Sequence, residues 1–187
     1  HRNTDQATIT EDQVPAHYTE EEIRSLGLQV AWNQEWRNFC VSDTFEPGSP
    51  SKIFTVAAAL EEGIVTPNDS FYCDGYQEVG GFPIKCTAYI KGGHQNVNLA
   101  ESLMVSCNDA MMQIGAKMGV ENFLKAQGTF NFGSRTGIDL PNEGYGIMHT
   151  VDTMHETELA CSAFGQGFSC TMIQEINAMC SVINGGY

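Results

Sequence analysis

The stretch Glu46-Pro47-Gly48-Ser49-Pro50-Ser51-Lys52 marks the point where a loop ends and an apolar helix begins. Proline is favoured at the first position of a helix, because the N–H group that it lacks would have no partner there. Residues 53–60 are rich in alanine and other apolar side chains, and Gly63 supplies a stop signal. The sequence therefore predicts a largely buried helix that begins at Ser49, with Ser49 as its N-cap.

Ser49 and Lys52 lie three residues apart, so they share one face of this helix. A serine becomes a nucleophile when a base removes its proton, and a neutral lysine can act as that base. Burial or nearby positive charge would have to lower the pKa of Lys52 from about 10.4 toward 7, a bias of roughly 4–5 kcal/mol. Such a pair occurs by chance roughly once in a chain of this length, so taken alone it is explained by a capping serine and a solvated lysine.

A second candidate site is Ser106-Cys107-Asn108, which separates two predicted helices. One helix is predicted over residues 99–105, and the next begins at Asp109, with methionines on its apolar side, and ends at Gly119. Taken alone, Ser106 is explained by a helix-end hydroxyl and Asn108 by a cap for the helix that follows.

Capping boxes predict helices at both ends of the chain. One is formed by Thr19 and Glu22, and we expect its helix to stop at Gly27. The other is formed by Thr171 and Gln174. The remaining predictions are a loop over residues 1–18, weak helix over 31–39, helix over 121–126, a loop over 130–141, and a C-terminal helix that ends at residues 184–186.

The composition indicates a globular domain and excludes several classes of partner. The chain has 187 residues, of which 42% are hydrophobic and 17% charged. Because 23 acidic residues face 9 basic ones, the net charge is −14, and we expect no binding to nucleic acid or to an anionic membrane surface. The longest apolar run, residues 56–60, is too short to span a membrane. The polar start shows no signal peptide and predicts a section of a longer polypeptide.

Seven cysteines are present, and two of them bracket a turn-rich segment. Cys73 and Cys86 enclose a glycine-rich stretch that is predicted to fold as a hairpin, and they are expected either to form a disulfide or to remain reduced. A disulfide would fit an extracytoplasmic location. No two cysteines have the C-x-x-C spacing and no histidine pair lies nearby, so the sequence predicts no zinc site, and the other five cysteines are interpreted as core residues.

Three further features are assigned structural roles. Trp32 and Trp36 are four residues apart and are predicted to pack on one helix face. His94 is interpreted as a loop histidine rather than a catalytic base. Gly165-Gln166-Gly167 lacks the third glycine and the preceding strand of a dinucleotide-binding loop, so it is interpreted as a site of close backbone packing.

Taken together, five segments resemble class B penicillin-binding proteins, over about residues 30 to 187. The nucleophile motif and Ser106-x-Asn108 correspond to the first two active-site motifs of this family and of serine β-lactamases. The other three are Val41-Ser42-Asp43-Thr44-Phe45, Thr136-Gly137-Ile138-Asp139-Leu140-Pro141 and Phe164-Gly165-Gln166-Gly167. The resemblance implies an α+β penicillin-binding transpeptidase fold, of which residues 1–187 form a part. That part is mainly helical, with the helical lobe over 31–187, the nucleophile helix and a small hairpin, and it lacks most of the core sheet.

The resemblance also implies an activity, peptidoglycan D,D-transpeptidation without a cofactor. Ser49 would attack a D-Ala-D-Ala stem peptide or a β-lactam, Lys52 would be the general base, Ser106 would relay a proton, and Asn108 would hold the substrate. The parent enzyme would act on the extracytoplasmic face of the membrane, with its anchor outside this chain and with division or elongation proteins as further partners.

Two departures from the family pattern carry expectations of their own. Ser51 replaces an aromatic residue, which predicts a looser hold on Lys52. The third motif, Lys-Thr/Ser-Gly, is absent from this sequence. Because the family's oxyanion hole uses an N–H group from that strand, and one such donor contributes about 10²–10³ in rate, this segment alone is expected to be weak or inactive. The alternatives are a β-lactamase or D,D-carboxypeptidase, and a non-catalytic scaffold.

Overall fold

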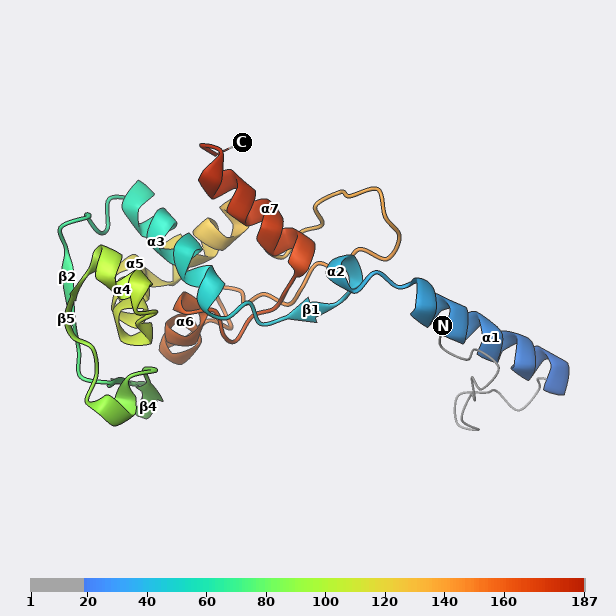
Figure 1. The fold of residues 1–187 in the computed structure, drawn as a ribbon, viewed down its shortest axis with the longest axis horizontal. Coiled ribbons are helices and arrows are strands. Elements are labelled where there is room, and N and C mark those ends of the chain that lie inside the picture. The colour runs from blue at the N-terminus through green and yellow to red at the C-terminus, as the bar shows by residue number, and fades with distance from the viewer. Residues whose placement is uncertain (1–18, 187) are drawn as a thin grey trace.

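The computed structural model describes residues 19–186, so the loop expected over residues 1–18 lies outside the described residues. The first element, α1 (Glu20–Trp36), stands apart from the rest of the molecule (Figure 1). Its predicted capping box is present, since the Thr19 hydroxyl accepts a hydrogen bond from the Glu22 amide and the Glu22 carboxylate accepts one from the Thr19 amide.

The expected stop at Gly27 is wrong, because α1 continues through it. A glycine inside a helix costs only about 1 kcal/mol, and no proline follows to end the helix. The predicted tryptophan pair is confirmed. The Trp32 and Trp36 rings stack with their centroids 5.9 Å apart, and both side chains are exposed, so they pack on each other and not on the core.

The remaining elements form the lobe that carries the candidate site. In chain order they are α2 (Phe39–Ser42), β1 (Thr44–Phe45), η3 (Ser49–Ser51), α3 (Lys52–Glu61), β2 (Ser70–Cys73), β3 (Tyr76–Val79), β4 (Phe82–Lys85), η4 (Tyr89–Lys91), β5 (Gln95–Asn98), α4 (Leu99–Met104), α5 (Asn108–Thr129), α6 (Glu156–Ala163), β6 (Cys170–Thr171) and α7 (Met172–Ile183).

The core of the lobe lies around α5, which packs against both α3 and α6. Met111, Met112 and Ile114 of α5 are completely or almost completely buried. Gly115 allows α6 to approach closely, since a Cβ atom at this position would lie 2.8 Å from the Cβ atom of Ala163. None of the described helices is long and apolar enough to cross a membrane.

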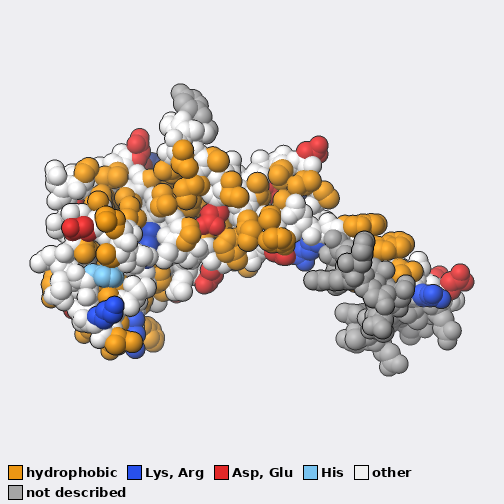
Figure 2. Space-filling model, viewed as in Figure 1, with side chains coloured by type: hydrophobic (Ala, Val, Ile, Leu, Met, Phe, Trp, Pro, Cys, Tyr) orange, Lys and Arg blue, Asp and Glu red, His pale blue; other side chains and the backbone are white. Residues whose placement is uncertain are grey.

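The strands of residues 19–186 form three separate antiparallel pairs, β1 with β6, β2 with β5, and β3 with β4. The last pair is the hairpin expected between Cys73 and Cys86, with Tyr76 opposite Lys85 and Val79 opposite Phe82. The mainly helical character and the small hairpin agree with the predicted α+β fold. On the face shown in Figure 2, basic side chains are few and scattered among apolar and acidic ones.

Most helix predictions within the lobe are confirmed. The helices predicted over 99–105 and 172–184 are α4 and α7, and those predicted over 109–119 and 121–126 are the two halves of α5. Gly119 has φ 74° and kinks α5 instead of ending it. The helix α6 was not predicted. Its N-cap is His155, which does not belong to the usual capping residues, and its sequence gives only a weak apolar stripe.

The loop that contains Thr136-Gly137-Ile138-Asp139-Leu140-Pro141 is held by one carboxylate. Glu143 accepts hydrogen bonds from the Thr136 amide at 2.6 Å, from the Thr136 hydroxyl at 2.5 Å and from the Gly137 amide at 3.1 Å. These hydrogen bonds lower the pKa of Glu143 below its usual value, and the bond from the Thr136 hydroxyl has the largest effect. Together they outweigh burial, which acts in the opposite direction.

We expect Glu143→Gln to lower the free energy of unfolding by about 1–3 kcal/mol at pH 7, because hydrogen bonds to a charged acceptor are replaced by weaker ones. A carboxylate with a depressed pKa stabilises the folded state above its unfolded pKa, and that contribution is lost as the pH falls through the folded value. The difference between the two proteins should therefore shrink in acid. Urea unfolding followed by far-UV circular dichroism at pH 7 and near pH 3 measures it, and a difference independent of pH would contradict the role of the charge.

Candidate active site

Four polar side chains from two segments that are far apart in the sequence meet at one point. The Lys52 amine at the start of α3 donates to the Ser106 hydroxyl at 2.8 Å and to the Asn108 Oδ1 atom at 2.7 Å. It also donates to the Ser106 carbonyl at 2.7 Å. The Ser106 hydroxyl in turn lies 3.0 Å from the Ser49 hydroxyl. The expected convergence of positions 49, 52, 106 and 108 is thus present. The Ser106 hydroxyl lies between the Ser49 hydroxyl and the Lys52 amine.

The Ser49 side chain is positioned by a turn that begins at glycine. Gly48 is the N-cap of η3, with φ 64° and ψ −145°, and Ser49 is the first residue of that turn. The prediction that Ser49 is itself the N-cap is therefore wrong. The capping position is Gly48, one residue before Ser49, and its left-handed φ is easily adopted only by glycine.

Ser106 and Asn108 are positioned by the sharp turn between α4 and α5. Ser106 has φ 53°, an unusual value for a residue with a side chain, and its amide donates to the Leu103 carbonyl at 3.0 Å. Asn108 does not cap α5, because the N-cap is Cys107, whose sulfur accepts from the Ala110 amide at 3.4 Å. The side chain of Asn108 is therefore available to Lys52.

Lys52 is buried and has only neutral acceptors around its amine. Its side chain is 2% exposed, and no carboxylate forms an ion pair with it among residues 19–186. Burial lowers the pKa of Lys52 below its ordinary 10.5, and the nearby Cys86 and Cys107 oppose this shift without cancelling it. The environment thus favours the neutral amine more than water does, which is the condition that a lysine base requires.

The backbone of the turn that carries Ser49 is held by the segment Phe164-Gly165-Gln166-Gly167. The Gly48 amide donates to the Gly165 carbonyl at 2.8 Å, and the Glu46 carboxylate accepts from the Gly167 amide at 3.0 Å. Gly165 has φ 96°, and a Cβ atom there would collide with the Gly48 carbonyl group and with the Ser51 hydroxyl. The predicted role of this segment in close backbone packing is confirmed.

Ser51 occupies the position at which the resemblance suggested an aromatic residue. It is buried, and its hydroxyl donates to the Gly48 carbonyl at 2.9 Å. A cavity of about 20 Å³ lies beside it, lined partly by the rings of Phe54 and Phe130. The looser hold on Lys52 expected from this substitution is not observed, because the lysine amine has three acceptors.

Cys73 and Cys86 are free in the structure, which therefore contains the reduced alternative and not the disulfide. Their sulfurs lie near His94 and Cys107, in one group of four. The prediction of no metal site relied on linear spacing, and the structure contradicts that premise because it gathers potential ligands from four segments.

The thiols of this group differ in pKa. Burial acts to raise the pKa of Cys86, but hydrogen bonds from backbone N–H groups, of which that of Ala88 is the strongest, lower the pKa to about 7. Burial raises the pKa of Cys107.

The chain is also similar to known proteins. Residues 6–187 match the family model described as penicillin binding protein transpeptidase domain. The chain is 42% identical over 151 residues to stage V sporulation protein D of Bacillus subtilis, which covers 80% of this chain and 23% of that protein. It is 27% identical over 158 residues to peptidoglycan D,D-transpeptidase MrdA of Escherichia coli K12, covering 80% of this chain and 25% of that protein. The chain thus spans about a quarter of these relatives.

Solved structures show the same fold. A peptidoglycan synthetase from Bifidobacterium adolescentis superposes with a TM-score of 0.76 at 30% identity, over 83% of this chain and 28% of the other. Penicillin-binding protein 3 from Mycobacterium tuberculosis, complexed with aztreonam, superposes with a TM-score of 0.73 at 27% identity, over 80% of this chain and 33% of the other.

Proposed function

Because this chain belongs to the penicillin-binding protein transpeptidase domain family, we propose that it carries the nucleophile and the proton-transfer groups of a serine peptidoglycan D,D-transpeptidase. The observation that supports this most directly is the position of the Ser106 hydroxyl, 3.0 Å from the Ser49 hydroxyl and 2.8 Å from the Lys52 amine. A single hydroxyl in contact with both groups can pass a proton between them.

In the proposed acylation, neutral Lys52 takes the proton of Ser49 through Ser106. The Ser49 oxygen forms a bond to the carbonyl carbon of the penultimate D-alanine of a stem peptide. The bond to the last D-alanine breaks, and Ser106 returns the proton to the departing amine. Asn108 accepts from Lys52 through Oδ1, and its Nδ2 group, which takes no part in that bond, donates to the substrate amide.

In the second half of the reaction, an amine from a neighbouring stem peptide attacks the acyl-enzyme, forms the cross-link and regenerates Ser49. A β-lactam would acylate the same oxygen and remain attached. We place this reaction outside the cytoplasmic membrane, with division or elongation proteins as partners of the parent enzyme. A β-lactamase or carboxypeptidase would give the acyl group to water, and a non-catalytic scaffold would not acylate at all.

The test uses a chimera, because the chain spans about a quarter of its relatives. Residues 39–186 would replace the matching segment of stage V sporulation protein D, and labelling by a fluorescent penicillin would be measured. We expect stoichiometric labelling of the chimera, none for its Ser49→Ala variant, and labelling of the isolated chain at least about 10²–10³-fold slower for want of an oxyanion-hole donor.

Three outcomes would decide against parts of the proposal. A folded chimera that is not labelled, beside a labelled parent protein, would favour the scaffold. Fast steady-state hydrolysis of nitrocefin would favour the β-lactamase. Rapid stoichiometric labelling of the isolated chain would refute the expectation that it is weak or inactive by itself.

A further inference from the structure

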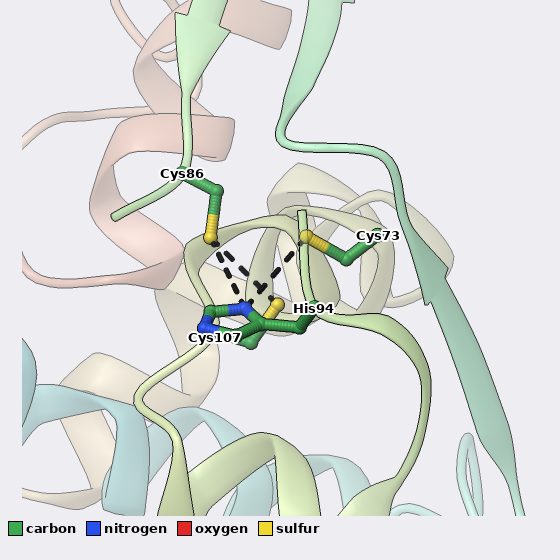
Figure 3. Close-up of side chains that lie close together, drawn as sticks. All are labelled: Cys73, Cys86, His94 and Cys107. Atoms are coloured by element: carbon green, nitrogen blue, oxygen red, sulfur yellow. Dashed lines mark hydrogen bonds between the residues drawn. The ribbon is translucent and has the colours of Figure 1, made fainter. Parts of the chain in front are cut away.

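A second cluster of reactive side chains lies beside the catalytic groups and is not used in the reaction above. It consists of Cys73 at the end of β2, Cys86 just after β4, His94 in the loop before β5, and Cys107 at the N-terminus of α5 (Figure 3). One ligand atom from each residue lies within 4.8 Å of the other three. The three cysteines are buried and His94 is half-buried.

Three of the six distances among these atoms are close to those of a tetrahedral metal site, and all six are within 4.8 Å. For Zn–S bonds of about 2.3 Å and Zn–N bonds of about 2.0–2.1 Å, tetrahedral angles place two sulfurs about 3.8 Å apart and a sulfur and a nitrogen about 3.6 Å apart. In the structure the Cys86 and Cys107 sulfurs are 3.9 Å apart. The His94 Nδ1 atom lies 3.6 Å from the Cys86 sulfur and 3.8 Å from the Cys73 sulfur.

A disulfide explains this arrangement less well. It would draw two sulfurs to about 2.05 Å and leave the third cysteine and the histidine without a role. Instead, the Cys73 and Cys86 sulfurs both lie near the same imidazole nitrogen of His94, as two ligands of one ion lie near a third (Figure 3).

The backbone around the cluster is built to bring these segments together. Gly93, with φ 89°, packs directly against the Cys73 carbonyl group, where a Cβ atom would collide. Gly75, just after Cys73, accepts through its carbonyl a hydrogen bond from the Cys86 amide at 2.7 Å. These contacts fix the positions of three of the four ligands without any cross-link between their side chains.

We propose that Cys73, Cys86, His94 and Cys107 bind one zinc ion. Three thiols lose their protons to solvent, the three thiolates bind through sulfur, and neutral His94 binds through Nδ1, so the bound site carries a net charge of −1 and no oxidant or reductant is needed. Three cysteines and one histidine complete a four-coordinate shell, which is typical of structural zinc and leaves no position for substrate. Because Cys107 lies between Ser106 and Asn108, the ion would fasten the hairpin and the adjoining loop to the turn that positions both residues.

Zinc binding is tested directly on the purified 187-residue protein, without reference to Ser49 chemistry. We expect the reduced protein, after incubation with Zn²⁺ and desalting, to retain one zinc ion per chain by inductively coupled plasma mass spectrometry. Co²⁺ in its place should give the visible absorption of a tetrahedral thiolate complex. Bound zinc should also protect three cysteines from alkylation, which peptide mass spectrometry identifies individually.

Matched variants separate the cluster from the other cysteines. Cys86→Ser and His94→Ala should lose most of the bound zinc, whereas Cys170→Ser, which alters a fully buried cysteine outside the cluster, should retain it. His94 is half-buried, so its variant is the safer one for folding, and circular dichroism of each metal-free protein checks that it is folded. The proposal is overturned if the folded, reduced protein retains no zinc, if His94→Ala and Cys86→Ser both keep it, or if adding zinc protects cysteines other than 73, 86 and 107 from alkylation.

Discussion

Replacing Lys52 with methionine is expected to slow acylation of Ser49 by about 10²–10⁴-fold, the usual contribution of a positioned general base. Methionine has a similar length and suits a buried position, but it cannot accept the proton that reaches the amine through Ser106. The rate should be measured in the chimera by rapid mixing with a fluorescent penicillin. Lys125→Met is the matched control, because Lys125 is exposed and pairs with Glu62, away from the site.

The pH dependence gives a second signature of the same base. Burial lowers the pKa of Lys52, so the protein with lysine should acylate faster as the pH rises and reach its plateau at a lower pH than an ordinary lysine would allow. Lys52→Met should lose this rise. Lys52→Gln provides a check if the methionine variant does not fold. A folded variant whose rate stays within about tenfold of the unchanged protein would eliminate Lys52 as the base.

Gly165→Ala is expected to lower the free energy of unfolding by about 2–5 kcal/mol and to abolish labelling of Ser49. The added Cβ atom would collide with the Gly48 carbonyl group, and a side chain is disfavoured at φ 96°. Relief of the collision would separate Gly165 from Gly48 and break the 2.8 Å hydrogen bond that holds the nucleophile turn. Unfolding in urea and penicillin labelling of the chimera measure the two effects.

Gly128→Ala is the control for the glycine substitution. Gly128 lies in α5 and a Cβ atom there would meet nothing within 4 Å, so alanine should leave labelling unchanged and raise stability by up to about 1 kcal/mol. If Gly165→Ala behaved like Gly128→Ala, the contact between the two glycine segments would have no importance for the site.

The sequence predicted those parts of the molecule that depend on local signals. The nucleophile helix, α4 and α7 are marked by proline, glycine and capping residues close to their ends, and the structure contains all three. The helix α6 lacks such a signal at His155, and Gly27 gave a false one because tolerance of glycine depends on the rest of the helix. Local chemistry also missed the true N-cap at Gly48, which requires knowledge of the backbone angles.

The candidate sites were predictable to different degrees. Ser49 and Lys52 lie on one turn, so their proximity follows from helical spacing, whereas Ser106 was placed beside them only by the resemblance to a family. The zinc ligands could not be found from spacing, since Cys73 and Cys107 are 34 positions apart and meet only through the packing of β2 against α5. Contacts between segments that are far apart in the sequence leave no periodic pattern in that sequence, so they cannot be predicted from it.

The stacked tryptophans have a practical consequence for optical spectroscopy. The chain has two tryptophans, and both lie on α1, exposed and outside the lobe. Their fluorescence will therefore report the surroundings of α1 and remain nearly silent while the lobe melts. Tyrosine emission comes largely from the lobe, so one sample yields two separate unfolding traces. A shift confined to the indole signal reports a change in the surroundings of α1.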